Sequence, residues 1–138
     1  MKMLLTTLAS FAFLAIAGAQ DDAETKKDKA ILAGMWKMEV FETADGKVDN
    51  LVGAMLTFEG DKLEFKHDDT KKSSYTINPA GKPKEITIKN ENGEMNGIYK
   101  IEKETLTICI CLEPNQARPN EFAAKNPYVL ATLKRSKD

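Results

Sequence analysis

The sequence predicts an all-β domain: an eight-stranded antiparallel up-and-down barrel with a short N-terminal helix. Apolar and polar residues alternate in eight short segments, as they do on strands that turn one face toward a core. Turns containing Gly, Asn, Asp or Pro separate most of these segments and no helical pattern interrupts them, so neighbouring strands are expected to run antiparallel. Closing eight strands into a barrel leaves no exposed sheet edge.

The clearest pair of strands is Ala54–Glu59 with Lys62–Lys66. Their alternation is strict, and Gly60 and Asp61 form a tight link between them. The remaining predicted strands show the same alternation with small irregularities. They are Met35–Thr43, Ser73–Asn78, Lys84–Lys89, Met95–Glu102, Thr105–Leu112 and Tyr128–Arg135.

A two-sheet sandwich is the alternative architecture for an all-β chain of this length. Sandwiches usually contain longer Greek-key crossovers, whereas the only long connection predicted here is Pro114–Lys125. The barrel is therefore favoured. The segment Asp21–Lys29 is charged and is either a linker or the solvated start of a helix. Lys29–Ala33 would extend that helix, and Gly34 would end it.

The N-terminus has the three parts of a cleavable export signal. Lys2 supplies a positive start, Met3–Ala17 is an apolar run, and small residues precede a cleavage site after Ala19. The alternative is a membrane anchor, but the run is shorter than the roughly 20 apolar residues that span a bilayer. We therefore expect a signal peptide at 1–19, a linker or helix start at 20–29 and a barrel domain at 30–138. The mature protein would be periplasmic, bound to the cell envelope or extracellular, and not membrane-spanning.

The charge balance gives no reason to expect a nucleic-acid partner. The chain has 20 Lys and Arg residues against 21 Asp and Glu residues, a formal net charge of −1. A basic surface patch is the usual electrostatic mark of nucleic-acid binding. The charged residues here are of mixed sign along the chain, so no such patch is predicted.

The two cysteines, Cys109 and Cys111, are two residues apart on a predicted strand and should point to the same face. Their Cα atoms would be about 6.5–7 Å apart, at the edge of the range that a disulfide tolerates. We expect two reduced, partly buried thiols. A strained or intermolecular disulfide is the alternative, and a soft-metal site lacks identifiable further ligands.

Six stretches distributed along the chain belong together: Gly34-Met35-Trp36-Lys37, Leu56 to Lys62, Lys82 to Ile86, Gly97-Ile98-Tyr99, Arg118 to Phe122 and Leu133-Lys134-Arg135. In combination they resemble an uncharacterised lipocalin-like family of exported bacterial proteins that is abundant in planctomycetes. The resemblance covers about residues 28–135, nearly all of the mature chain.

The resemblance implies a calycin-type barrel with a structural signature at its closed end. Gly34 and Trp36 look like the lipocalin signature of the first strand. In lipocalins this Trp packs beneath an Arg from near the last strand, and Arg135 is the expected counterpart here, with Arg118 as the alternative. Lipocalins also carry a helix after the last strand, which is not expected in this chain because three residues follow Arg135.

The sequence offers little for catalysis or metal binding. His67 is the only His, and it lies beside Asp68 and Asp69 in a predicted polar loop. Zinc sites usually need three or four protein ligands, so a solvated loop His is the better interpretation. No phosphate-binding loop or hydrolase motif is present. We expect no enzyme activity, no cofactor and no metal.

Two hypotheses about function remain open. We expect the barrel either to bind a small hydrophobic ligand in its interior, or to be packed solid and bind a protein or envelope partner through its outer loops. The bulky inward residues leave little interior room. We expect the segment Arg118–Phe122 to fold over one barrel end, with Phe122 as a plug and Arg118 paired to a carboxylate. The candidate ligand-lining residues are Leu56, Phe58, Phe65, Tyr75, Ile86, Tyr99 and Ile108.

Overall fold

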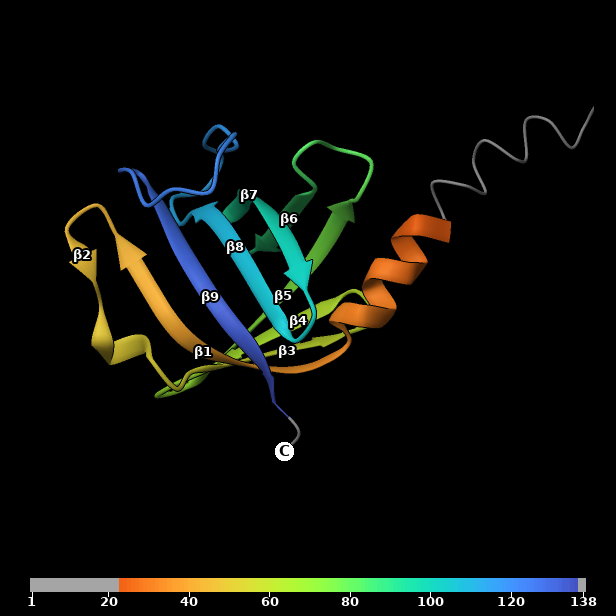
Figure 1. Cartoon of the computed structure of the whole chain (residues 1–138), viewed down its shortest axis with the longest axis horizontal. Coiled ribbons are helices and arrows are strands. Elements are labelled where there is room, and N and C mark those ends of the chain that lie inside the picture. The colour runs from red at the N-terminus through yellow and green to blue at the C-terminus, as the bar shows by residue number, and fades with distance from the viewer. Residues whose placement is uncertain (1–22, 137–138) are drawn as a thin grey trace, which may run out of the picture.

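The computed structural model describes residues 23–136 as a closed antiparallel barrel preceded by a helix (Figure 1). The predicted signal peptide and its cleavage site lie outside the described residues, so both stay predictions. The eight barrel strands are β1 (Gly34–Thr43), β3 (Met55–Glu59), β4 (Lys62–Lys66), β5 (Thr70–Asn78), β6 (Glu85–Asn90), β7 (Gly93–Glu102), β8 (Thr105–Cys111) and β9 (Tyr128–Ser136).

The sheet closes because β1 pairs with two neighbours at once. Its first residues, Gly34 to Lys37, pair with β3, while Met35 to Glu42 pair with β9. A β-bulge between Met38 and Val40 shifts the register, and bulges bend and twist a strand locally. All other pairings join strands that are consecutive in the chain. The predicted eight-stranded up-and-down barrel is thus confirmed, and the sandwich alternative is not what forms.

The strand bounds follow the predicted segments, with informative differences at the open end of the barrel. A two-residue strand, β2 (Gly46–Lys47), folds back on β1 and leads into a short 3-10 helix, η1 (Asp49–Leu51). Strand β5 begins three residues earlier than predicted, because Lys71 and Lys72 pair with β4. These residues resemble a loop in sequence because a barrel rim is solvated on both faces.

The described helix, residues 23–32, lies at one end of the barrel (Figure 1). Leu32 is completely buried there. Asp28, the one buried charged residue in the described chain, accepts hydrogen bonds from the Tyr99 hydroxyl at 2.6 Å and from Lys84 Nζ at 3.0 Å. Gly34, which was expected to cap the helix, instead opens β1 with a φ of +117°, a conformation that L side chains rarely adopt. This end of the barrel is therefore closed by the helix.

Removing the Asp28 carboxylate should loosen this closure. Asp28→Ala leaves the buried Tyr99 hydroxyl without its acceptor, which should lower the free energy of unfolding by about 1–3 kcal/mol. Chemical denaturation followed by tryptophan fluorescence measures the change. Glu24→Ala, an exposed position one turn earlier in the same helix, is the matched control and should change stability by less than about 0.5 kcal/mol. Equal effects of the two substitutions would contradict this account.

Candidate functional site

The closed end of the barrel is organised around Trp36. Its side chain is completely buried, and its indole Nε1 donates a hydrogen bond to the Leu32 carbonyl at 2.8 Å. The Arg135 guanidinium lies over the ring, with Cζ 4.3 Å from the ring centroid. The same guanidinium donates to the carbonyls of Ala33 and Ile31 at the end of the helix. Arg135 is thus the residue that stacks on Trp36.

Aromatic side chains fill the space above Trp36. Phe58 and Tyr75 pack edge to face with their ring centroids 5.0 Å apart, and Tyr99 is fully buried beside the helix. Burial raises the pKa of Tyr99 far above its usual range, and its hydrogen bond to Asp28 acts in the same direction. Burial likewise raises the pKa of Tyr75. Both phenols therefore stay protonated at neutral pH and serve as packing and hydrogen-bonding groups.

The opposite end of the barrel contains a cavity of about 370 Å³. All eight barrel strands contribute to its wall, together with Leu51 from η1 and Leu112, the residue after β8. The lining residues are Met38, Phe41, Leu51, Leu56, Leu63, Phe65, Lys71, Ser73, Ile88, Asn90, Met95, Ile108, Ile110, Leu112, Ala131 and Leu133.

The wall of this cavity is mainly aliphatic, aromatic and thioether surface. Its only polar side chains are Lys71, Ser73 and Asn90. Cavities of this size and composition are typical of sites for small molecules, in which apolar surface supplies binding energy and a few polar groups fix orientation. No side chain in the wall has the arrangement of a nucleophile with a neighbouring base.

The structure separates the predicted ligand-lining residues into two groups. Leu56, Phe65 and Ile108 line the cavity. The other four do not line it and are packed solidly in the interior, each at 1% exposure: Phe58, Tyr75, Ile86 and Tyr99. Alternation identifies which side chains point inward, but it does not tell how far along the barrel each one lies. For the same reason the sequence did not single out Met38, Met95 or Ala131.

A second hollow, of about 490 Å³, lies on the outer surface of β3, β4 and β5. Two of its lining residues, Leu63 and Ser73, also line the cavity. The lining of the hollow consists of Thr57, Glu59, Asp61, Lys62, Leu63, Glu64, Lys72, Ser73 and Ser74. Eight of these nine residues are polar or charged, with charges of both signs, so this wall is more polar than that of the cavity.

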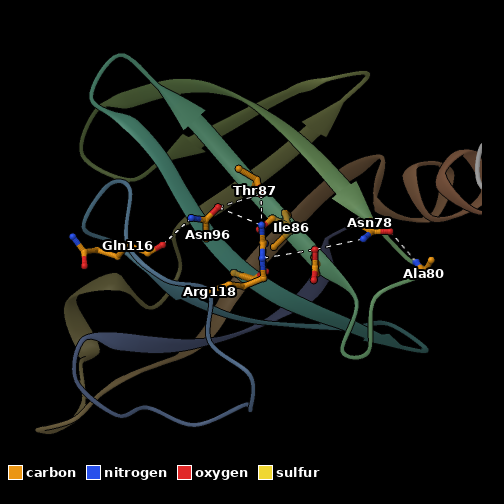
Figure 2. Close-up of polar contacts among 9 residues, drawn as sticks. Asn78, Ala80, Ile86, Thr87, Asn96, Gln116 and Arg118 are labelled. Carbon is orange, nitrogen blue, oxygen red and sulfur yellow. Dashed lines mark hydrogen bonds and ion pairs between the residues drawn. The ribbon is translucent and has the colours of Figure 1, made fainter.

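The connection between β8 and β9 lies against the outside of the barrel, and Arg118 holds it there (Figure 2). Its Nη1 donates to the carbonyls of Ile86 and Gly97, both at 2.8 Å, and its Nη2 donates to Thr87 Oγ1 at 2.9 Å. Glu85 lies 3.8 Å from its Nε, which gives the expected carboxylate partner. We name the connection, residues 112–127, the strap.

The expectation that the strap plugs a barrel end is wrong. Phe122 lies beneath the Lys100 ammonium, 4.9 Å from the ring centroid, and Lys100 is an exposed, outward residue of β7. The strap instead covers a small apolar cluster on the outer face, formed by Ile98, Cys109 and Cys111, which are buried although they do not belong to the interior core. The sequence signal was present, because the segment Ile108 to Cys111 is apolar on both faces.

Both cysteines are free thiols with no solvent exposure. The Cys109 thiol donates a hydrogen bond to the Ala123 carbonyl of the strap at 3.4 Å, and burial raises its pKa. A raised pKa disfavours the thiolate, which is the reactive form of cysteine. The thiols are thus fully buried rather than partly buried, and they act as packing groups under the strap.

The structure assembles no metal centre from the described residues. His67 is exposed in the turn between β4 and β5, and within residues 23–136 no three His, Cys, Asp or Glu side chains are placed to hold an ion together. Across the same residues, no helix has the length and apolar character needed to cross a membrane. Comparison of the chain with known protein families, with curated proteins and with solved structures gave no significant match.

Trp36→Ala should be among the most damaging single substitutions in this protein. It removes a fully buried indole, leaves the Leu32 carbonyl without its donor and takes away the ring on which Arg135 stacks, so we expect a loss of about 3–5 kcal/mol in the free energy of unfolding. Because the substitution also removes the only tryptophan, circular dichroism during thermal unfolding is the suitable measurement. Trp36→Phe keeps most of the volume and should lose less. A Trp36→Ala protein of unchanged stability would contradict this structural role.

Arg118→Ala should release the strap and expose the thiols beneath it. The carbonyls of Ile86 and Gly97 lose a shared donor, and the strap loses its main attachment to β6 and β7. The reaction of Cys109 and Cys111 with an aromatic disulfide reagent should accelerate at least about tenfold, because access to buried thiols requires local opening. Lys125→Ala removes an exposed strap cation that pairs with Glu121 and is the control. Unchanged thiol reactivity in Arg118→Ala would show that the strap stays in place without Arg118.

Proposed function

We propose that this protein is an exported, lipocalin-like binding protein that holds a small, mainly apolar molecule in the open half of its barrel. The single observation that carries this proposal is the cavity of about 370 Å³ with its predominantly apolar wall. This volume falls in the range of small-molecule sites. The closed half is packed solid, so the ligand would enter and leave through the open end.

The mouth of the cavity supports this direction of entry. Leu112 lines the cavity and is 52% exposed, and Val52, next to the lining residue Leu51, is 46% exposed. These two are the exposed large hydrophobic residues of the described chain. Apolar side chains that remain in water at the mouth of an apolar cavity give a hydrophobic ligand a continuous path from the surface to the interior.

Export of the protein and its membership of the lipocalin-like family are also part of this proposal. The charged start, apolar run and small residues before Gln20 support export, and the stretches from Gly34-x-Trp36 to Arg135 support membership of the uncharacterised lipocalin-like family of planctomycete-type bacteria.

The competing function is a barrel that binds a protein or envelope partner through its outer loops and holds no ligand. The exposed Val52 and Leu112 are compatible with that function, since exposed apolar residues also mark interaction surfaces. The cavity distinguishes the two functions, because a partner that docks on the rim does not require empty space behind it.

Native mass spectrometry of the protein purified from its own host is the direct test. A co-purifying small molecule of stoichiometric amount supports the binding function. Titration with the neutral fluorescent probe phenylnaphthylamine provides a second readout, and we expect saturable binding of one probe per chain. A clean apoprotein mass together with the absence of probe binding would refute the proposal.

Filling the cavity should abolish probe binding while leaving the fold intact. Ala131 lies on β9 with its small side chain in the cavity wall, so Ala131→Trp places an indole in the hollow. We expect at least a tenfold loss of probe affinity, with a stability change within about 1–3 kcal/mol. Lys134→Trp adds the same group to the outer face of the same strand, where the side chain is exposed, and should leave probe binding unchanged.

A further inference from the structure

Lys71 is the only charged side chain among the residues that line the cavity. Its ammonium group makes no hydrogen bond or ion pair within the part of the chain that the structure describes. No other charged residue between positions 62 and 72, in β4, in the first part of β5 or in the turn between them, is part of the cavity wall. A cation that faces an apolar cavity without a counter-charge can form a charge-assisted hydrogen bond with an anionic group of a ligand.

The register of the strands places this cation on the inner face. Lys71 pairs with Phe65 of β4, and Phe65 pairs with Leu56 of β3. Residues directly opposite each other on antiparallel strands project to the same face, and both Phe65 and Leu56 line the cavity. The neighbouring residue, Lys72, pairs with Glu64 and projects outward. Lys71 is therefore at the inner edge of the mouth.

Two neutral polar groups lie in the same wall. The Ser73 hydroxyl has no hydrogen-bond partner in the described chain. Asn90 uses its Oδ1 to accept a hydrogen bond from the Asn92 backbone N–H at 2.8 Å, so its amide nitrogen remains available to donate. Together with the Lys71 ammonium these groups provide donors, which is the set that an oxyanion requires.

We propose that the ligand is an amphiphile: a single alkyl chain lies in the apolar cavity and its terminal oxyanion binds Lys71 at the mouth. This inference rests on the proposed binding function and specifies its ligand class. The lysine side chain is a point charge on a flexible stem, so carboxylate and sulfate head groups are both accepted. The chain enters first and the charged end stays in contact with water, which avoids the cost of burying an ion.

The depth of the cavity sets the length of that chain. Along β8 the lining runs from Ile108 to Leu112, which is about 13 Å at the rise of a β-strand. Below this level the interior is filled by Trp36, Phe58 and Tyr99. A medium-length alkyl chain such as that of decanoate matches this depth, whereas a longer chain such as that of palmitate would leave methylene groups outside.

The alternative role for Lys71 is to keep an apolar rim soluble, as charges do elsewhere on strand ends. That role predicts no difference between ligands of opposite charge. The two roles are separated by four probes that share a decyl or decanoyl chain and differ in head group: decanoate, decyl sulfate, decanol and decyltrimethylammonium, each below its critical micelle concentration. Palmitate serves as the test of chain length.

Isothermal titration of the full mature chain should show decanoate and decyl sulfate binding at least about fivefold more tightly than decanol, a ratio in keeping with one partly exposed ion pair. Decyltrimethylammonium should bind more weakly than decanol. Lys71→Gln should remove the preference for the anions and leave decanol binding unchanged, while Lys71→Arg keeps the preference. Lys72→Gln, the outward neighbour, is the matched control and should behave as the natural protein. Added salt should reduce the preference, because screening weakens exposed charge pairs.

The possible results separate three questions: the role of Lys71, the length of the alkyl chain and the binding function itself. Equal affinity for decanoate and decanol, or an unchanged preference in Lys71→Gln, overturns the assignment of Lys71 and leaves the binding function standing. Tighter binding of palmitate than of decanoate overturns the chain length. Failure of all four probes, decanol included, overturns the binding function and with it this inference. Thermal unfolding of Lys71→Gln at the same midpoint as the natural protein confirms that the comparison concerns folded chains.

Discussion

The stacking of Arg135 on Trp36 is the interaction on which the rest of the barrel depends. It joins three parts of the chain that are far apart in sequence: the end of the N-terminal helix, the first strand and the last strand. The register pairs Trp36 directly with Arg135 across the β1–β9 seam, so the stack forms only when the barrel is closed. The stack therefore stabilises the pairing of β1 with β9. These two strands are the farthest apart in sequence, so bringing them together has the largest entropic cost.

Sealing one end divides the interior into two halves with different physical properties. The closed half contains most of the largest fully buried side chains, including Trp36, Phe58, Tyr75 and Tyr99, and close packing there leaves no space for another molecule. The open half has the smaller Ala131 and the flexible Met38 and Met95 in its wall. Methionine side chains adapt to irregular shapes, so the wall of this half is more adaptable than the packed half.

Sequence patterning predicted the strands of this fold well and the position of the site less well. Alternation in Leu56-Thr57-Phe58 shows that Leu56 and Phe58 point inward, yet one lines the cavity and the other lies in the packed half. The difference between them is their height along the barrel, which depends on strand stagger and on the helix that seals one end. Neither is encoded in local periodicity. The role of Arg135 came from the resemblance to lipocalin-like proteins, since no local pattern links it to Trp36.

The position of the strap was missed for a different physical reason. The segment Ile108 to Cys111 is apolar at consecutive positions, a pattern that indicates burial on both faces of a strand. The outer face of an isolated barrel is in contact with water, so outward apolar residues at these positions need another segment to shield them from solvent. The strap is that segment. Arg118 could not be assigned to it from sequence because four of its five described partners are backbone carbonyls or neutral side chains, which carry no complementary charge pattern to detect.

The helix and the strap together explain how the barrel tolerates an unfilled half. Empty apolar space lowers stability because the surrounding side chains lose contacts, and a sequence selected for stability alone would fill it with a larger residue at a position such as Ala131. Here the stabilising contacts lie elsewhere: Asp28 and Leu32 attach the helix to the closed end, and Arg118 attaches the strap to the outer face. Because neither the helix nor the strap occupies the open half, the cavity stays open.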